Sequence, residues 1–307
     1  MGFNFLHLLG QLFFLLVIPP FFGGIITKVK AFFSGRKGPP VLQPYYDLAK
    51  LFRKERIYSF SSSFLTRFVP PVSFILYLAA GLLFPCWGPS PIAFRGDLIL
   101  FAYLLALSRF LILLMALDAG SSFEGMGASR EATLGALSEL AFFLGWVVLA
   151  VLSQTTSLSE IFQWKDHSGM FNPAPLLLFV SFFIILLTEN CRIPIDDPST
   201  HLELTMIHEV MILDLSGPDL ALILYGNSIK LFIFMALAAS LLAPYGPLGE
   251  IQSMERLLIK VTGIAFTIGV VESMNARLRW IKIPQLLMAN FVMMTFALLV
   301  ILFERGA

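Results

Sequence analysis

A dense group of ionisable side chains follows an uncharged hydrophobic run in the second half of the sequence. The run covers residues 175–187, and the stretch TENCRIPIDDPSTHLELTMIHEV (188–210) comes directly after it. Its ionisable residues are Glu189, Arg192, Asp196, Asp197, His201, Glu203, His208 and Glu209, and Asp214 follows shortly afterwards. Carboxyl groups in a medium of low dielectric constant hold protons more tightly, and a neighbouring carboxylate strengthens this effect. The stretch therefore predicts groups that exchange protons near neutral pH.

The chain around this cluster has the composition of a membrane protein. Of its 307 residues, 57% are hydrophobic and only 13% are charged, which is about half the charged fraction of a typical soluble domain. Apolar runs of about 20 residues recur along the sequence, and each is long enough to cross a bilayer as a helix. The net charge of +1 indicates neither a nucleic-acid partner nor any other strongly charged partner.

Eight hydrophobic segments are expected to be transmembrane helices, which places both termini on one side of the membrane. The connections after the first, third, fifth and seventh segments hold 14 of the 21 Lys and Arg residues, against 4 in the termini and the other connections. The positive-inside rule therefore predicts that these basic loops are cytoplasmic and that the termini face outward. The predicted spans are residues 3–26, 68–87, 98–117, 133–152, 175–187, 220–243, 257–274 and 284–303.

The predicted fold is an all-α polytopic membrane protein with about eight transmembrane helices. Residues 1–307 are expected to form a single membrane domain, with short amphipathic or interfacial helices in its cytoplasmic loops. The longest of these connections are an amphipathic loop at residues 27–67 and an acidic connection at residues 188–219.

Several charged residues fall inside the predicted spans, where they are costly and usually face a cavity, a proton relay or a partner. By helix rise, Glu139, Glu189 and Glu272 lie in the cytoplasmic half of the bilayer, with Arg109 near its middle and Lys230 deeper. The predicted proton path combines these groups with the loop acids: Glu139, Glu189, Glu203, Glu209, Asp214, Lys230 and Glu272. The alternative is static ion pairing of Glu139 or Glu189 with Arg109 or Arg192, which would only hold the helices together.

The cytoplasmic loops offer candidate contacts for other molecules. In GRKGPPVLQPYYDLAKLFRKE (35–55), the pattern predicts an amphipathic helix that either lies on the membrane surface or docks a soluble partner. GMGASRE (125–131) is typical of a Gly-rich turn before the fourth span, with Ser129 as its cap. A short helix is expected to begin near His201. The predicted docking residues are Arg36, Lys37, Asp47, Lys50, Arg53, Lys54, Arg130, Glu131, Arg277 and Arg279.

The sequence offers no catalytic constellation and no metal site of its own. Cys86 and Cys191 lie far apart and lack the spacing of an iron–sulfur site. HEVMI (208–212) lacks the second histidine of a zinc-binding HExxH motif. Any redox cofactors are therefore expected in other subunits.

Four separated stretches together resemble the subunit 1 (H-type) membrane subunit of respiratory complex I and its relatives in membrane-bound nickel–iron hydrogenases. They are GRKGPPVLQPYYDLAKLFRKE (35–55), GASREATLGAL (127–137), TENCRIPIDDP with LDLSGPD (188–198 and 213–219), and ESMNARLR (272–279). TENCRIPIDDP is similar to the ETNRxPFDxPE pattern of that family. The eight-span layout with outward termini agrees with the same resemblance.

The sequence also departs from complex I. ITKVK (26–30) replaces an acidic–basic pair, and LYGN (224–227) stands where a glutamate is expected early in the sixth span. Lys230 and ESMNARLR look instead like the formate hydrogenlyase and hydrogenase branch of the family. These departures weaken the case for quinone binding.

The resemblance implies a coupling subunit rather than a catalytic one. It implies hydrogenase-like large and small subunits with a nickel–iron site and iron–sulfur clusters, and antiporter-like and small membrane subunits, in a prokaryotic cytoplasmic membrane. The loop acids would sense charge changes in the soluble arm, and Lys230 would hand them laterally to the antiporter-like subunits. The alternatives are a quinone-binding complex I subunit, a stand-alone ion or solute carrier, and a purely structural anchor.

Overall fold

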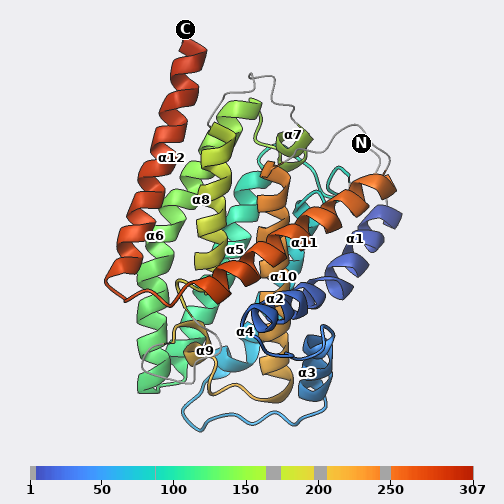
Figure 1. Ribbon diagram of the computed structural model, residues 1–307. Helices are drawn as coiled ribbons and strands as arrows, with labels where there is room; N and C mark the ends of the chain where they lie inside the picture. Colours follow the sequence, from blue (N-terminus) through green and yellow to red (C-terminus); the bar gives the residue numbers. More distant parts are fainter. Residues whose placement is uncertain (1–4, 87, 164–173, 197–205, 243–249, 307) are drawn as a thin grey trace.

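The protein is a bundle of helices, and the part of the chain described here contains no strand (Figure 1). The computed structural model describes residues 5–86, 88–163, 174–196, 206–242 and 250–306. Its helices are α1 (Phe5–Val17), α2 (Pro19–Phe33), α3 (Gln43–Phe52), α4 (Phe64–Leu83), α5 (Asp97–Asp118), α6 (Ser122–Ser153), α7 (Leu158–Gln163), α8 (Ala174–Glu189), α9 (His208–Met211), α10 (Gly217–Leu242), α11 (Glu250–Met274) and α12 (Lys282–Gly306).

The predicted all-helical membrane fold is confirmed, and the count of eight spans is approximate. In the described residues, 7 segments are long and apolar enough to cross a membrane, with α1 and α2 counting as one. The predicted fifth span corresponds to the shorter apolar helix Pro175–Glu189. Both chain ends lie at one end of the bundle, while α3, α9 and the connection between α3 and α4 lie at the other (Figure 1).

The first span is broken in two by a pair of prolines. Pro20 lacks the backbone N–H that would donate to the carbonyl of Leu16, and the amide of Phe21 donates to Ile18 instead of Val17, so both carbonyls lose their helical donors. Tyrosine hydroxyls from two other helices replace them: Tyr45 on α3 donates to the carbonyl of Val17, and Tyr225 on α10 donates to that of Leu16. These side chains satisfy the backbone at the break, as a buried membrane segment requires.

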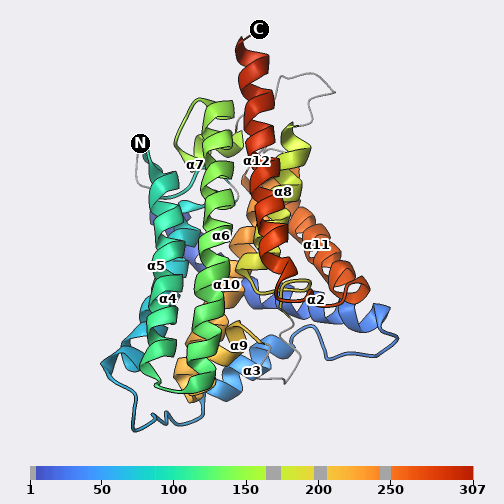
Figure 2. The same ribbon diagram turned by 90° about the vertical axis from the view of Figure 1, so that its left-hand side faces the viewer.

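The break sets α2 at an angle to the rest of the bundle. Figure 2 shows α2 lying nearly across the upright helices α6, α10 and α12, with the oblique α11 packed against it. A Cβ at Gly269 of α11 would lie 2.7 Å from the side chain of Val29 on α2, so the small residue permits this close packing. α2 continues to Phe33, and the prediction that the first loop begins at residue 27 is therefore wrong, because Lys28 and Lys30 extend the helix.

The two halves of the bundle differ in chemistry. Trp146 of α6 packs against Phe101, Phe142 and Phe182 at ring distances of 5.8, 5.7 and 5.7 Å, in the half that holds the chain ends. The indole nitrogen of Trp146 is buried and has no hydrogen-bond partner in the part described. Because aromatic rings surround this side chain, we describe the packing around Trp146 as an aromatic layer.

The Gly-rich stretch before the fourth predicted span is helix rather than turn. α6 begins at Ser122, and Ser121 is its cap, accepting a hydrogen bond from the amide of Phe123 at 3.3 Å. The prediction of a turn capped by Ser129 is therefore wrong. A Cβ at Gly127 would lie 2.9 Å from the carbonyl oxygen of Ile207, so this glycine serves close packing rather than a change of chain direction.

The predicted amphipathic helix of the first loop is present as α3, and it packs on α2 and α10. Leu48 is buried against the protein, whereas Tyr46 and Phe52 are exposed. The apolar face of α3 is thus divided between the bundle and its surroundings.

The SGPD motif (216–219) fastens the chain between α3 and α4 to the start of α10. Ser216 donates to the carbonyl of Ile57 at 3.0 Å and accepts from its amide at 2.8 Å. Asp219 accepts a hydrogen bond of 2.7 Å from Tyr58 and lies 3.4 Å from Nε of Arg56. Gly217 adopts a φ of +54°, and a Cβ there would lie 2.4 Å from the carbonyl oxygen of Glu55.

Gly217→Ala is expected to detach this segment, because it adds both left-handed strain and a backbone clash. Faster tryptic cleavage after Lys54 and Arg56 in detergent-solubilised protein is the predicted result. The matched control is Gly125→Ala, where no atom lies within 4 Å of an added Cβ in the described structure. Equal cleavage rates for the two variants would contradict the role given to Gly217.

Candidate functional site

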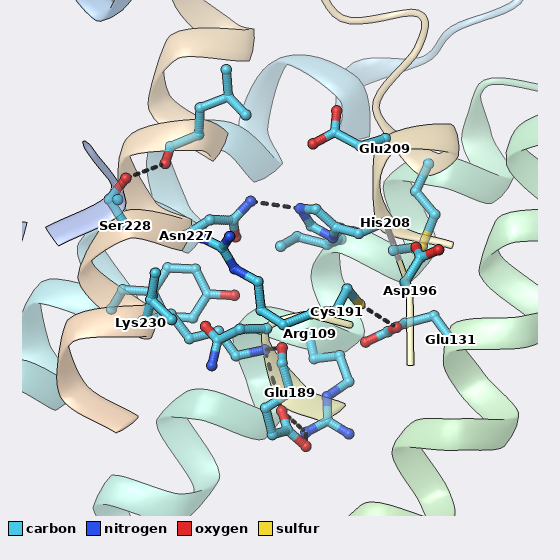
Figure 3. A pocket seen from close by; sticks show the side chains of 18 residues that line it. Arg109, Glu131, Glu189, Cys191, Asp196, His208, Glu209, Asn227, Ser228 and Lys230 are labelled. Atoms are coloured by element: carbon cyan, nitrogen blue, oxygen red, sulfur yellow. Dashed lines mark hydrogen bonds and ion pairs between the residues drawn. The ribbon is translucent and has the colours of Figure 1, made fainter. Parts of the chain in front are cut away.

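A polar cavity of about 210 Å³ lies in the half of the bundle that holds α9 (Figure 3). Its walls come from α2, α4, α5, α6, α9 and α10, together with the end of α8 and the chain after it. The ionisable groups that line it are Tyr77, Arg109, Glu131, Glu189, Cys191, Arg192, Asp196, His208, Glu209 and Lys230. At roughly 30 Å³ per water molecule, the cavity has room for about seven waters. Its lining combines these ionisable groups with apolar side chains.

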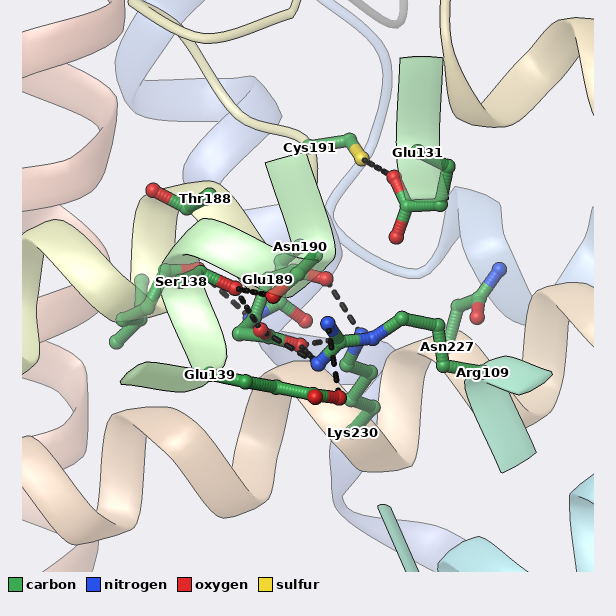
Figure 4. A network of polar contacts seen from close by, with 12 residues as sticks. Arg109, Glu131, Ser138, Glu139, Thr188, Glu189, Asn190, Cys191, Asn227 and Lys230 are labelled. Atoms are coloured by element: carbon green, nitrogen blue, oxygen red, sulfur yellow. Dashed lines mark hydrogen bonds and ion pairs between the residues drawn. The ribbon is translucent and has the colours of Figure 1, made fainter. Parts of the chain in front are cut away.

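Glu189, the last residue of α8, is the centre of the ionic network beside this cavity (Figure 4). Nη2 of Arg109 donates to both carboxylate oxygens of Glu189 at 2.6 Å, and Nζ of Lys230 lies 3.2 Å from Oε2. Ser138 donates to Oε1 at 2.7 Å, and Lys230 also donates to the backbone carbonyl of Glu189 at 2.6 Å. One buried carboxylate therefore joins α5, α6, α8 and α10.

Arg109 connects this network to a second acid. Its Nη1 lies 3.4 Å from Oε1 of Glu139, so both acids that the alternative pairs with Arg109 or Arg192 contact Arg109, and neither is paired with Arg192 in the described residues. Nη1 and Nε of Arg109 are buried and make no hydrogen bond within the described residues. The guanidinium is therefore held tightly by Glu189 and loosely by Glu139. A Cβ at Gly135 would lie 2.6 Å from Nη1, so only glycine leaves room for Arg109 to pass α6.

A second set of ion pairs surrounds the cavity on the side of α2 and α11. Glu272 lies 3.2 Å from Arg192 and 3.7 Å from Lys30, while Asp196 lies 3.2 Å from Arg277. Glu272 does not line the cavity itself, whereas its partner Arg192 does. Arg109 thus links Glu139 and Glu189, whereas Glu272 pairs with Arg192 and Lys30 in a separate set.

The prediction that Glu131 is a docking residue is wrong. Glu131 is 7% exposed, lines the cavity, and accepts a contact of 3.6 Å from the thiol of Cys191. In the part of the chain described, no ion pair involves Glu131. Because α6 begins eleven residues earlier than predicted, Glu131 lies inside a helix instead of at a loop. The clue in the sequence is its four-residue spacing from Gly127 and Gly135, which places all three on one helix face.

Lys230 does not lie at a lateral surface of the bundle. Its ammonium group is buried and contacts the side chain and the backbone of Glu189. The role expected for it in lateral transfer stays a prediction. Its position instead makes it the second cation of the central network.

His208 and Glu209 bring the acidic connection to the cavity. Nε2 of His208 lies 2.5 Å from the side-chain amide nitrogen of Asn227, so that ring nitrogen is the acceptor. Burial and the nearby Lys230 lower the pKa of His208 to about 4. The pKa of Glu209 is raised by burial and by Asp196, against the opposing effect of Arg192. His208 is therefore neutral at pH 7, and Glu209 takes up a proton more readily than an ordinary glutamate.

Asp214 lies outside the cavity. It is exposed, and partial burial of its carboxyl group together with the neighbouring Glu124 raises its pKa. Glu124 is 1% exposed, and its Oε2 has no hydrogen-bond partner in the structure as described. Sequence reasoning misses Glu124, because the glycines that follow it indicate a turn rather than a helix.

The remaining predicted residues fall into two groups. Asp197, His201 and Glu203 lie outside the described residues, as does the start of the helix expected near His201. The docking candidates Arg36, Lys37, Asp47, Lys50, Arg53, Lys54 and Arg279 are exposed. Arg130 donates to the carbonyl of Met206 at 3.1 Å and lies over the ring of Trp280, and Arg277 is paired with Asp196.

Known proteins share this arrangement over nearly the whole chain. A model of the NADH dehydrogenase family matches residues 6–303. The chain belongs to this family. Hydrogenase-4 component C of Escherichia coli (strain K12) is 32% identical over 297 residues, covering 94% of this chain and 93% of that protein. Formate hydrogenlyase subunit 4 of the same strain is 30% identical over 300 residues, covering 93% and 95%.

The complex I branch of the NADH dehydrogenase family is similar over a shorter length. NADH-ubiquinone oxidoreductase chain 1 of Triticum aestivum is 30% identical over 230 residues, covering 70% of this chain and 67% of that protein. A chain in the structure of the membrane-bound sulfane sulfur reductase, an archaeal respiratory membrane complex, has the same fold, with a TM-score of 0.85 at 22% identity and coverage of 97% and 99%. The resemblance inferred from the four motifs is confirmed, and the protein is a helical membrane subunit related to those of hydrogenase-4 and formate hydrogenlyase.

The pKa of His208 predicts how acid affects the fold. A histidine has its ordinary pKa of 6.5 when unfolded and about 4 in this structure, so the unfolded chain binds protons more readily between these values. The stability that depends on neutral His208 is complete above pH 6.5 and is lost as the pH falls toward 4. Gln at this position keeps a polar group beside Asn227 and does not titrate. His208→Gln is therefore expected to reduce the fall in melting temperature across this range.

Melting temperatures of the purified protein in detergent at several pH values would measure the effect. His7→Gln, on α1 away from the cavity, is the control for the loss of a histidine. An unchanged acid response in His208→Gln would contradict the buried, neutral state assigned to His208.

Proposed function

We propose that this chain is the membrane subunit of a hydrogenase or formate hydrogenlyase-type complex, where it anchors the soluble redox arm and couples electron transfer to translocation of H⁺ or Na⁺. The observation that carries the proposal is Glu189, a buried carboxylate shared by Arg109 and Lys230 at the wall of a polar cavity. The relatives named as a component or a subunit of larger enzymes support membership of a complex rather than action as a stand-alone carrier.

The cavity geometry supports coupling. Charges that share a low-dielectric space interact strongly, so a charge added at one wall changes the protonation and pairing of the others. Asp196 and Glu209 lie at the wall formed by the acidic connection, and Arg109 and Lys230 lie at the opposite wall near Glu189. A charge change in the soluble arm would act on Asp196 and Glu209 first. The contacts of the Arg109 guanidinium would then shift between Glu189 and Glu139.

The same cavity argues against quinone as its occupant. Its volume of about 210 Å³ lies below the roughly 300–1,000 Å³ of pockets that bind drug-sized molecules. Ten ionisable groups line it beside apolar side chains such as Ile112 and Met211. Its small volume suits water and ions better than a quinone ring with its apolar tail.

The proposal assigns the redox centres to partner subunits. In the described residues no three His, Cys, Asp or Glu side chains are grouped as a metal site requires, and Cys86 and Cys191 are buried in separate segments. The proposal therefore includes hydrogenase-like large and small subunits that carry a nickel–iron site and iron–sulfur clusters. It also includes antiporter-like and small membrane subunits as the membrane partners.

The exposed basic residues of the first loop supply the docking surface in this proposal. Arg36, Lys37, Arg53 and Lys54 flank α3, which lies at the same end of the bundle as α9. The proposal places this end on the cytoplasmic side of a prokaryotic cell membrane, in agreement with the excess of Lys and Arg there.

Glu189→Gln is expected to separate redox chemistry from ion translocation. The amide keeps the shape of the side chain but leaves the two cations without their shared anion. In inverted membrane vesicles of the intact complex, we expect at least a tenfold lower ratio of ions translocated to electrons transferred, with electron transfer itself within about twofold of wild type. Ion-sensitive dyes for H⁺ and Na⁺ would distinguish the two ions.

Two further variants complete the experiment. Glu255→Gln changes an exposed acid on α11 outside the cavity and should leave the ratio unchanged. Glu131→Gln changes a cavity acid without breaking an ion pair of the described residues, so it remains informative if Glu189→Gln prevents assembly. A wild-type ratio in an assembled complex carrying either cavity variant would contradict coupling and would favour a purely structural anchor.

A further inference from the structure

A second pocket, with a volume of about 630 Å³, lies at the end of the bundle that holds the chain termini, where α6 ends and α7 begins (Figure 1). Its volume falls within the roughly 300–1,000 Å³ of pockets that bind drug-sized molecules. Its apolar wall is formed by Val147, Ala150 and Val151, and its polar rim includes Arg95 and Glu160. No described residue lines both this pocket and the cavity beside Glu189, so the two are separate.

The pocket lies across the boundary between the apolar part of α6 and the polar chain that follows. The predicted fourth span, residues 133–152, covers about 30 Å of helix, which is the thickness of the hydrocarbon core. Val147, Ala150 and Val151 lie in its last two turns, and Gln154 ends the helix with a φ of +58°. The apolar wall therefore lies at the depth of acyl chains, and the polar rim lies at the depth of lipid headgroups.

Buried hydrogen bonds fix the two charged residues of the rim at the same pocket. Asp97, at the start of α5, is buried, and it accepts hydrogen bonds from the amide of Leu158 at 2.7 Å and from the hydroxyl of Ser157 at 3.2 Å. These contacts hold the chain before α5 against the start of α7. Arg95 and Glu160, each two residues from a member of this contact, are therefore held at one pocket although they are far apart in the sequence.

The rim offers one positive and one negative group that are not paired with each other in the described structure. Both side chains are exposed. Glu160 accepts a hydrogen bond from the hydroxyl of Thr155, whereas Arg95 makes no ion pair or hydrogen bond within the described residues. The pocket therefore combines an anion-binding group, a cation-binding group and an apolar wall, and its two charges cancel.

A zwitterionic phospholipid complements each of these three features. A guanidinium binds a phosphate through charge-assisted hydrogen bonds, and its planar shape allows two of them at once. A primary ammonium group has three N–H donors for a carboxylate, whereas a quaternary ammonium group has none. A lipid with a negative charge and no amine would leave Glu160 beside a like charge. A primary amine on the headgroup is therefore the best match to the rim.

We propose that this pocket binds one phospholipid with a primary-amine headgroup, such as phosphatidylethanolamine, from the leaflet on the side of the chain termini. Arg95 holds its phosphate, Glu160 holds its ammonium group, and its acyl chains lie along Val147, Ala150 and Val151. This site is separate from the charge network around Glu189, so the inference does not depend on the coupling function.

Photolabelling with synthetic lipids tests the site. The intact complex would be reconstituted in bilayers that contain phosphatidylethanolamine, phosphatidylcholine or phosphatidylglycerol, each with a diazirine near the start of one acyl chain. Mass spectrometry of the α6 peptide would measure the labelling of residues 147–151. We expect about tenfold more labelling by phosphatidylethanolamine, because the other two lipids lack the N–H groups that bind Glu160.

Two variants separate the roles of the charged residues. Glu160→Gln is expected to bring labelling by phosphatidylethanolamine and phosphatidylglycerol within about twofold of each other. Arg95→Gln is expected to reduce labelling by all three lipids about tenfold, because each carries a phosphate. Glu255→Gln and Arg256→Gln are the matched controls. They change exposed residues of α11 that do not line the pocket and should keep the wild-type labelling.

Several results would overturn the proposal. They are equal labelling of the wild type by phosphatidylethanolamine and either other lipid, a preference for phosphatidylethanolamine over phosphatidylglycerol that persists in Glu160→Gln, and an absence of adducts at residues 147–151. The last result would show that another molecule, such as a protein chain, covers the pocket. Val151→Trp fills the pocket without changing its charges, so it keeps the test decisive if the charge variants do not assemble. Unchanged labelling of α6 in this variant would also contradict the site.

Discussion

The structure depends on one buried carboxylate that two cations share. Glu189 ends α8 and meets Arg109 from α5, Lys230 from α10 and Ser138 from α6, so four helices converge on one side chain. At 3.2 Å and an effective dielectric constant of 20, one such pair has a gross attraction of about 5 kcal/mol, which largely offsets the cost of burying both charges. The net stabilisation from each pair is therefore small. A nearby change of charge can then shift which cation is paired with Glu189.

Close packing at glycines and a second set of ion pairs hold this network in place. Gly127 lets the chain before α9 approach α6, and Gly135 lets Arg109 pass it. The ion pairs of Glu272 with Lys30 and Arg192 hold the acidic connection against α2. The pair of Asp196 with Arg277 holds it against the chain before α12. The aromatic rings around Trp146 pack in the opposite half of the bundle. Arg109 lines the cavity and also contacts Glu139, which lies outside it, so the ionic network extends beyond the cavity wall.

The sequence predicts those features that follow from local composition. Long apolar runs predict the helices, the amphipathic pattern around Leu48 predicts α3, and charges inside the spans locate Arg109, Glu139 and Glu189. A proton path and static ion pairing are the two interpretations of these three residues, and both involve the ion pairs seen here. The structure identifies which groups are in contact. A role in coupling depends on whether these pairs change during turnover.

The errors have a common physical origin in tertiary packing. Glycines at 125 and 127 suggest a turn, because a sequence does not show that Ile207 will pack closely against that helix face. The same error assigns Glu131 to a surface and hides Glu124. The depth of Lys230 can be counted along its helix, whereas the direction in which it points depends on the packing of α8 and α10.

The most direct measurement of the central claim is a thermodynamic cycle on the detergent-solubilised protein, in which Glu189→Gln is made in the wild-type chain and in a chain that also carries Arg109→Met and Lys230→Met. If Glu189 is the shared anion, its loss should lower the free energy of unfolding markedly in the first background and little in the second, with a coupling on the order of 1–3 kcal/mol. Equal losses in the two backgrounds would show that Glu189 does not depend on these cations and would contradict the account.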